Sequence, residues 1–357
     1  MVRAALAQIH GGNLLRLSEA AGMAEERLLD FSASINPLGM PRQARQAIGR
    51  ALQGLGHYPD TEARRLRQAI SERYSIEDRS IIVANGSTEL IYLIPRALRP
   101  GRVLVTAPAF SEFERAALLS GARVRRLALR KHAGFSIDPG AFIDAMKGSD
   151  MAILCNPNNP TGRMLGREEV LETARAARRN RCVLVVDEAF MDFCPGGSVL
   201  GEKNPYLIVL RSLTKFYALA GLRLGFGFFP AGIRRKIEGF KEPWSVNTLA
   251  QAAGTAALGD SGFATRTLGL IKRERNYLVK ALDSLGMRTY PSDANYILAV
   301  CRDSAALTRG LIKSGIAVRD CSNFRGLGRT HVRIAVRSRR ENDALLGVLQ
   351  KIYGRPA

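Results

Sequence analysis

The sequence lacks the features of a membrane-spanning protein, of a secreted protein and of a metal-binding protein. Its 357 residues contain no apolar run long enough to span a bilayer, and residues 1–10 lack the apolar core and cleavage pattern of a signal peptide. The five cysteines are scattered and form no CxxC pair, which argues against a disulfide framework or a zinc site. We therefore expect a cytoplasmic protein with reduced thiols, no metal and no membrane association.

The charge of the chain is strongly one-sided. Lys and Arg number 53 against 32 Asp and Glu, which gives a net charge of +21. Such an excess can mark a nucleic-acid-binding protein, but the arginine pairs are spread along the chain, without a basic tail, a zinc finger or an RNA-binding aromatic motif. A solvated basic surface is the simpler interpretation, so we expect no nucleic-acid partner. A third reading, that some arginines attract an anionic substrate, has to be decided by their positions.

Short apolar runs alternate with amphipathic stretches through the middle of the chain. The runs have the length of buried strands, and stretches such as 110–119 and 167–179 have helical spacing. This alternation predicts an α/β fold, in which a mostly parallel sheet is covered by helices on both faces. Ligands bind beyond the carboxyl ends of the strands in such sheets. The expected strands are 81–83, 103–105, 124–129, 151–154, 183–186, 207–210 and 224–229.

The pattern changes after Pro243 and Trp244. A helical region at about 248–285 leads to three shorter strands and a final amphipathic helix. The opening segment is rich in Gly, Ser and Asn around one short helix, and it reads as an arm. We expect the arm at 1–45 to pack with a small α+β domain at 248–357, beside a large domain at 46–247. The expected strands of the small domain are 295–300, 316–319 and 332–336.

Two polar clusters that follow predicted strands are candidate ligand-binding turns. Residues 85–89, with the sequence NGSTE, open a helix, and their backbone N–H groups and hydroxyls suit a phosphate. The alternative is that Ser87 only caps the helix. Residues 156–162, with the sequence NPNNPTG, form a turn made rigid by two prolines. Such a turn is either structural or aims an asparagine amide at a ligand, and local sequence leaves both possibilities open.

Two further clusters hold candidate catalytic groups. Asp187 ends the most apolar strand of the chain, and a carboxylate there needs a partner. That partner is either a protonated ring nitrogen or a nearby arginine. Lys215 follows another buried strand, in the segment RSLTKF, with Arg223 eight positions on. A lysine in this setting can form a Schiff base with a carbonyl cofactor, although Ser-x-x-Lys alone is common on protein surfaces.

Taken together, the four clusters resemble, in order and spacing, the fold type I pyridoxal-phosphate enzymes of the aspartate-aminotransferase superfamily. The resemblance runs from about Asn36 to Arg333, nearly the whole chain. It implies that Lys215 forms the Schiff base and that Asp187 pairs with the pyridine nitrogen. It also implies that Asn159 bonds the phenolic oxygen of the cofactor. The other cofactor-binding residues implied by the resemblance are Gly86, Ser87, Thr88, Ser212 and Arg223 at the phosphate and Phe110 stacked on the ring.

The resemblance also carries expectations about partners and substrate. Tyr58, in the segment HYPD, resembles a tyrosine given to the cofactor phosphate of a neighbouring subunit, which implies a homodimer. Arg333 matches the arginine that binds the substrate α-carboxylate. One position departs from the pattern: Phe190 stands where aminotransferases of this superfamily usually carry a tyrosine bonded to the phenolic oxygen.

Two subfamilies fit the motifs, the histidinol-phosphate aminotransferases and the L-threonine-O-3-phosphate decarboxylases of cobalamin synthesis. The segments HGGN at 10–13, DFSASINPLG at 30–39, PWSVN at 243–247 and VRDCS at 318–322 look like the decarboxylase, and Phe190 agrees with that choice. Both substrates carry a phosphate, so a second anion site is implied, with His10, Asn36, Arg319 and Arg333 as its candidates. For His10 the alternative is a disordered terminal residue, and for Arg319 a surface ion pair.

We therefore expect decarboxylation of L-threonine O-3-phosphate, with transamination of a phosphorylated amino compound as the alternative. Spacing alone does not reveal which bond at the α-carbon breaks. A reading of another class is a non-catalytic regulator that uses the fold to bind DNA or a partner. That reading predicts an added DNA-binding domain or a lost lysine, and the sequence retains Lys215.

Overall fold

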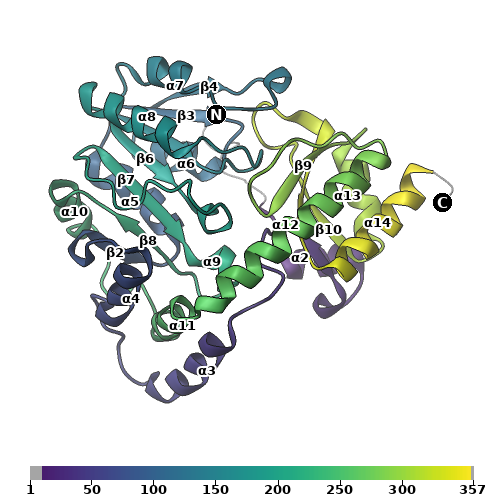
Figure 1. Ribbon diagram of the computed structural model, residues 1–357, viewed down its shortest axis with the longest axis horizontal. Helices are drawn as coiled ribbons and strands as arrows, with labels where there is room; N and C mark the ends of the chain where they lie inside the picture. The colour runs from purple at the N-terminus through teal and green to yellow at the C-terminus, as the bar shows by residue number, and fades with distance from the viewer. Residues whose placement is uncertain (1–9, 355–357) are drawn as a thin grey trace.

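The computed structural model of the protein describes residues 10–354. Its larger sheet has seven strands in the order β2-β8-β7-β6-β5-β3-β4, and only β8 runs antiparallel to its neighbours. Figure 1 shows this sheet on the left, between layers of helices. The predicted α/β class with a mostly parallel sheet is confirmed. The strands are β2 (Ile81–Ala84), β3 (Arg102–Ala107), β4 (Arg123–Ala128), β5 (Met151–Cys155), β6 (Val183–Asp187), β7 (Leu207–Ser212) and β8 (Gly225–Phe228).

Side chains of the central strands alternate between two hydrophobic cores, one on each face of this sheet. In β7, for example, Leu207 and Val209 belong to one core, whereas Ile208 and Leu210 belong to the other. A strand that is buried on both faces reads as a continuous apolar run, which is why these strands are visible in the sequence. The helices of this domain are α3 (Arg42–Ala51), α4 (Arg64–Tyr74), α5 (Ser87–Leu98), α6 (Ser111–Leu119), α7 (Pro139–Met146), α8 (Arg167–Arg179), α9 (Leu213–Phe216) and α10 (Ala231–Glu238).

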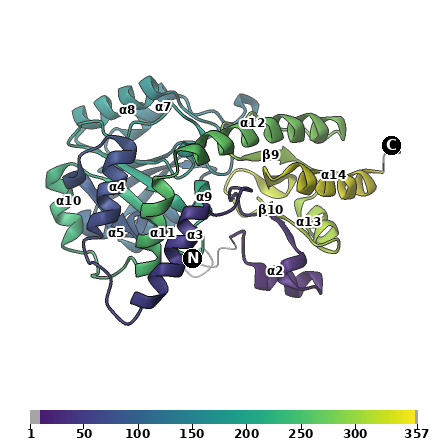
Figure 2. The same cartoon turned by 60° about the horizontal axis from the view of Figure 1, so that its bottom comes forward.

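A smaller sheet has four strands in the order β1-β10-β11-β9. Its first strand comes from the N-terminal segment: β1 pairs in parallel with β10, through Leu29 opposite Ile316 and Phe31 opposite Val318. The sequence gives no signal for β1, since it has three residues with polar Asp30 in the middle. Figure 2 shows α2 beside this sheet. The elements are α2 (Leu14–Ala21), β1 (Leu29–Phe31), β9 (Tyr296–Val300), α13 (Ser304–Ile312), β10 (Ile316–Asp320), β11 (His331–Ala335) and α14 (Arg339–Tyr353).

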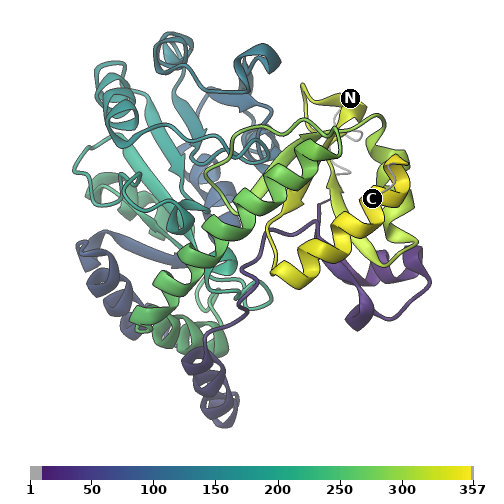
Figure 3. The same cartoon turned by 45° about the vertical axis from the view of Figure 1, so that its right-hand side comes forward.

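The predicted helical region at 248–285 is two helices, α11 (Thr248–Leu258) and α12 (Ser261–Ser284). They are separated at Gly259 and Asp260, and the Asp260 carboxylate caps α12 by accepting from the Phe263 N–H. Helix α11 packs on α3 and α4, whereas α12 continues to the smaller sheet (Figure 3). The 3-10 helices are η1 (Glu25–Arg27), η2 (Leu52–Gly54), η3 (Asp78–Ser80), η4 (Lys131–Ala133), η5 (Met191–Phe193) and η6 (Gly328–Thr330).

The register of the large sheet brings the polar clusters to one edge. Cys155 and Asp187, the last residues of β5 and β6, are direct partners, and β7 ends beside them at Ser212. Among residues 10–354, no helix is both long and apolar enough to cross a bilayer.

Candidate active site

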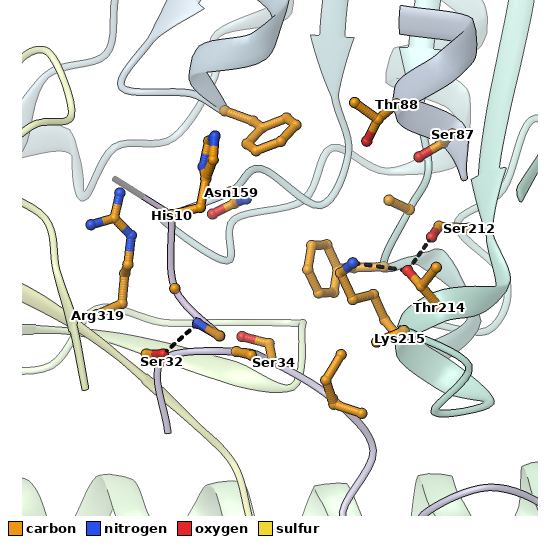
Figure 4. Close-up of a pocket in the computed structure, with 18 of the residues that line it drawn as sticks. His10, Ser32, Ser34, Ser87, Thr88, Asn159, Ser212, Thr214, Lys215 and Arg319 are labelled. Atoms are coloured by element: carbon orange, nitrogen blue, oxygen red, sulfur yellow. Dashed lines mark hydrogen bonds between the residues drawn. The ribbon is translucent and has the colours of Figure 1, made fainter. Parts of the chain in front are cut away.

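A cavity of about 460 Å³ lies where the carboxyl ends of the large-sheet strands meet the N-terminal segment and the smaller sheet. It gathers most of the predicted site residues from positions far apart in the chain. Figure 4 shows them on two sides, with Ser87, Ser212 and Lys215 facing His10 and Arg319. The predicted residues that line it are His10, Ser87, Thr88, Phe110, Asn159, Asp187, Ser212, Lys215, Arg223, Arg319 and Arg333.

Lys215 lies in α9, which begins directly after β7. Its Nζ donates to Thr214 Oγ1 at 2.8 Å, and Thr214 Oγ1 lies 2.6 Å from Ser212 Oγ. Burial, together with the positive charges of Arg223 and Arg333, lowers the pKa of Lys215 to about 8. The lowered pKa enlarges the uncharged fraction of this amine near neutral pH, and the uncharged form is the one that attacks a carbonyl carbon.

Asp187 is a carboxylate with too few partners. Its side chain accepts one hydrogen bond from within the described chain, from the Ala189 N–H at 3.2 Å. Burial raises its pKa to about 7. No arginine of the described chain forms an ion pair with Asp187, and the buried Arg211 pairs with Glu188 and Asp192. Asp187 therefore suits a ligand that carries a positive N–H group.

An anion-binding corner lies at the start of α5. Gly86 adopts φ 77° just before the helix, and a Cβ there would come within 2.5 Å of Arg223 Nη2. Glycine is thus needed for both the backbone turn and the approach of the guanidinium. The Arg223 guanidinium makes no ion pair with any of residues 10–354, and its one hydrogen bond there is from Nη1 to the Ala220 carbonyl at 3.3 Å. With Ser87 and Thr88 at the helix N-terminus, this corner suits a phosphate.

A second cationic corner is built by neighbouring strands. Arg319 in β10 and Arg333 in β11 are direct partners in the antiparallel ladder, and each is 7% exposed. Arg333 donates to Asn159 Oδ1 at 2.6 Å and to the Ser32 carbonyl at 2.7 Å. Burial lowers the pKa of both arginines, that of Arg319 to about 10.

Within the described chain neither arginine of this pair forms an ion pair with a carboxylate. Arg319 donates instead to neutral oxygens, including Asn323 Oδ1 at 2.9 Å. Asp320 and Asp30 act on the two arginines only from beyond ion-pair distance, and two adjacent buried cations without an ion-pair partner are costly in the absence of a ligand. The pair therefore favours a ligand with one or more anionic groups.

Three predicted residues lie outside the lining of the cavity. Gly86 lies next to the Arg223 guanidinium, as described above. Asn36 donates through Nδ2 to the Phe216 carbonyl at 2.7 Å and to Thr267 Oγ1 at 2.8 Å, so its amide N–H groups are used within the fold rather than offered to a substrate. The predicted substrate contact of Asn36 is thus not supported by its position. Tyr58 is 81% exposed and stacks on Trp244, with ring centroids 4.8 Å apart.

Phe190 lines the cavity without offering a polar group. Its ring packs edge-on against Tyr296 at 4.9 Å. The Tyr296 hydroxyl is committed elsewhere, because it donates to the Asn158 carbonyl at 2.9 Å. The departure from the usual tyrosine therefore leaves an apolar wall at this point.

Three polar groups in or beside the cavity were not predicted from the sequence. Ser34 is 2% exposed, lines the cavity, and its Oγ has no hydrogen-bond partner in the described chain. Thr214 links Lys215 to Ser212, and Glu112 holds His10 through a 3.0 Å contact with Nε2. Ser34 and Thr214 lie inside the segments SASIN and SLTK, but small hydroxyl residues are too common there to be singled out. Glu112 resembles an ordinary acidic residue of a first helical turn.

Comparison with known proteins gives the family. The model of the family described as aminotransferase class I and II matches residues 26–349. The chain belongs to this family and is a pyridoxal-phosphate-dependent enzyme of α/β fold, which confirms the resemblance found in the sequence.

The chain is similar to proteins with two different activities. It is 37% identical to a threonine-phosphate decarboxylase of Salmonella typhimurium, and the match covers 96% of each chain. A solved structure of the L-threonine-O-3-phosphate decarboxylase of Porphyromonas gingivalis has a TM-score of 0.81 and 27% identity, over 91% of this chain and 99% of that one. The histidinol-phosphate aminotransferase of Clostridium acetobutylicum has a TM-score of 0.86 and 31% identity, with the same coverage.

The side chains in the cavity fit the cofactor that the family implies. Pyridoxal phosphate requires an amine for its aldehyde, an acceptor for its ring N–H and donors for its phosphate. Lys215, the under-paired Asp187 and the Arg223 corner supply these groups in one cavity.

Proposed function

We propose that the protein decarboxylates L-threonine O-3-phosphate to (R)-1-amino-2-propanol O-2-phosphate and CO2, as a pyridoxal-phosphate-dependent carboxy-lyase of cobalamin biosynthesis. The observation that carries the proposal is the buried pair Arg319 and Arg333, which has no carboxylate partner in the described chain. A substrate with both a carboxylate and a phosphate supplies the missing charges. The similarity to two proteins named as decarboxylases of this substrate supports the same reading.

The residues of the chain divide the work. Bound pyridoxal phosphate supplies the electron sink for cleavage of a bond at the substrate α-carbon, and the protein decides which bond breaks. Asp187 accepts the ring N–H, while Ser87, Ser212 and Arg223 hold the phosphate of the cofactor. On the other side of the cavity, Arg319, Arg333 and His10 orient the anionic groups of the substrate.

Proton delivery at the α-carbon falls to Lys215. Its Nζ lies in the cavity beside Thr214 and has a pKa of about 8, so it can both hold and release a proton near neutral pH. The ring of Phe190, which packs on Tyr296, gives the cavity an apolar surface on one side. A proton from Nζ at the position that the carboxylate leaves yields the amine product.

The assay that tests the proposal mixes the enzyme, pyridoxal phosphate and L-threonine O-3-phosphate. Release of CO2 without a keto acid is the expected result. Formation of pyridoxamine phosphate in stoichiometric amount, recycled by 2-oxoglutarate, would contradict decarboxylation and support transamination. Lys215→Ala should lose the visible absorbance of the bound cofactor, whereas Lys241→Ala, a lysine outside the cavity that bonds Ser245 Oγ at 2.7 Å, should keep it.

The alternative function is transamination of a phosphorylated amino compound, as in the histidinol-phosphate aminotransferases. The high structural similarity to one of these enzymes favours it. The cationic corner formed by Arg319 and Arg333 would also accept the phosphate of that substrate. The assay above, rather than the cavity, therefore separates the two activities.

The proposed enzyme is a homodimer in the cytoplasm. Leu52, Leu55, Tyr58 and Trp244 are large apolar or aromatic side chains, each between 47% and 81% exposed. A surface with this composition is suited to burial against a second copy. Tyr58 would then reach the cofactor phosphate of the partner subunit.

A further inference from the structure

Glu112 is a buried carboxylate beside the cavity. It lies in the first turn of α6 and is 5% exposed. Burial raises the pKa of this carboxyl, but hydrogen bonds from His10 and Tyr92 outweigh burial and hold the pKa below its usual value. Glu112 is therefore ionised at neutral pH, and it depends on donors that come from its surroundings.

The groups around Glu112 come from two parts of the chain. The Tyr92 hydroxyl donates to Oε2, and Arg115 Nη1 lies 3.6 Å from the same oxygen. Both belong to helices of the large domain. His10, in contrast, belongs to the N-terminal segment, and its Nε2 lies 3.0 Å from Oε1. Glu112 thus holds a residue of the N-terminal segment against α6.

The backbone next to His10 is fixed independently. Gly12 N–H donates to Ser32 Oγ at 2.8 Å, and a Cβ at Gly11 would collide with the Ser32 carbonyl. That carbonyl also accepts a hydrogen bond from Arg333 Nη2. The main chain at 10–12 therefore lies beside Ser32, which also binds Arg333. With the backbone fixed in this way, the contact with Glu112 sets the direction of the His10 imidazole. Figure 4 shows His10 on the same side as Arg319.

We infer that Glu112 is a positioning residue that orients His10 to select substrates bearing a phosphate. A carboxylate only accepts, so Nε2 carries the proton in their contact and Nδ1 is left for a ligand. Nδ1 makes no hydrogen bond to any residue between 10 and 354. A phosphate ester loses its second proton at a pH of about 6. Nδ1 can accept from a phosphate oxygen that still carries its proton, and it can donate to a phosphate oxygen when the imidazole carries a proton on both nitrogens.

This inference rests on the proposed function for the presence of a phosphate in the substrate, but its test does not require turnover. Holoenzyme is titrated with L-threonine O-3-phosphate and with L-threonine, and binding is followed by the visible absorbance of the cofactor. The variant is Glu112→Gln, which keeps the size of the side chain. Its matched control is Glu114→Gln, two residues further on in α6, where the carboxylate bonds Arg126 Nε at 3.0 Å and does not line the cavity.

Glu112→Gln should weaken binding of L-threonine O-3-phosphate about tenfold, while binding of L-threonine and cofactor occupancy stay at the wild-type level. Glu114→Gln should bind both ligands as the wild type does. An equal loss for both ligands, or an unchanged preference for the phosphorylated one, overturns the inference.

His10→Gln supplies a second route to the same test. Because the two residues act as a unit, the double variant His10→Gln/Glu112→Gln should bind the phosphorylated ligand no more weakly than either single variant. Additive losses contradict the inference. A wild type that binds L-threonine O-3-phosphate selectively but releases no CO2 would reject the decarboxylase alone and leave the role of Glu112 standing. A wild type that releases CO2 but binds the two ligands equally well would reject the role of Glu112 alone.

Discussion

Several residues that line the cavity are buried ionisable groups that lack the usual partners. Asp187 has one backbone donor, and Arg319 and Arg333 face each other without a carboxylate from the described chain. Each of these groups is unfavourable in the empty fold, and each is relieved by a ligand of the right charge. Their placement therefore lowers the stability of the empty protein and strengthens the binding of cofactor and substrate.

Asp187→Asn tests this idea in the protein without cofactor. Burial raises the pKa of Asp187 from 3.8 to about 7, so between these values the folded protein holds a proton that the unfolded chain releases. The contribution of this group to stability is therefore lost as pH rises from about 4 to about 7, by about 4 kcal/mol in total. Across this interval the urea midpoint of the wild type should fall relative to that of the variant. A constant difference between the two proteins would contradict the assignment.

Gly86→Ala should weaken cofactor binding beyond the effect of backbone strain. An added Cβ would come within 2.5 Å of Arg223 Nη2 and push the guanidinium from the phosphate corner. Gly121→Ala is the matched control, since Gly121 has φ 88° but open space around it. Both variants bear a backbone cost of about 1–2 kcal/mol. Only Gly86→Ala should lower the affinity for pyridoxal phosphate, by about tenfold or more. Equal affinities of the two variants would contradict a role of Gly86 in cofactor binding.

Among the elements, α12 begins as a helix separate from α11 because the residue before it, Asp260, caps its first turn. Asp260→Ala removes the hydrogen bond to the Phe263 N–H and should cost about 1 kcal/mol of unfolding free energy. Lys280→Ala, at an exposed position of the same helix, should change stability by less than about 0.5 kcal/mol. Urea denaturation of the holoenzyme measures both. An Asp260→Ala protein as stable as the wild type would mean that packing alone starts the helix.

How far the sequence predicts each element follows from the range of the forces involved. The fold and the positions of Asp187 and Lys215 were predictable, because buried strands leave apolar runs and the carboxyl ends of parallel strands share one edge. The pairing of β1 with β10 was not, since three residues give no period and their partner strand is remote in the chain. The contact between His10 and Glu112 depends on how two distant segments pack, and spacing carries no information about it.

For the molecule as a whole, the proposed dimer predicts complementation between defective subunits. Tyr58→Ala should impair the site of the partner, whereas Lys215→Ala destroys the site of its own subunit. When the two variants are unfolded, mixed and refolded, half of the sites in a hybrid dimer have both groups intact. Cofactor absorbance above the mean of the two separate variants is the expected result. A mixture that equals the mean would exclude Tyr58 from a shared site.

The pairing of β1 with β10 also has a consequence for synthesis of the chain. Leu29 and Phe31 leave the ribosome long before Ile316 and Val318, with which they pair. At about 5–20 residues per second, this separation corresponds to roughly tens of seconds. During that time the sequence of the large sheet is completed at the end of β8, whereas the first strand of the small sheet still has no partner. The cavity between the two sheets is thus completed last, which delays a working enzyme until translation is nearly finished.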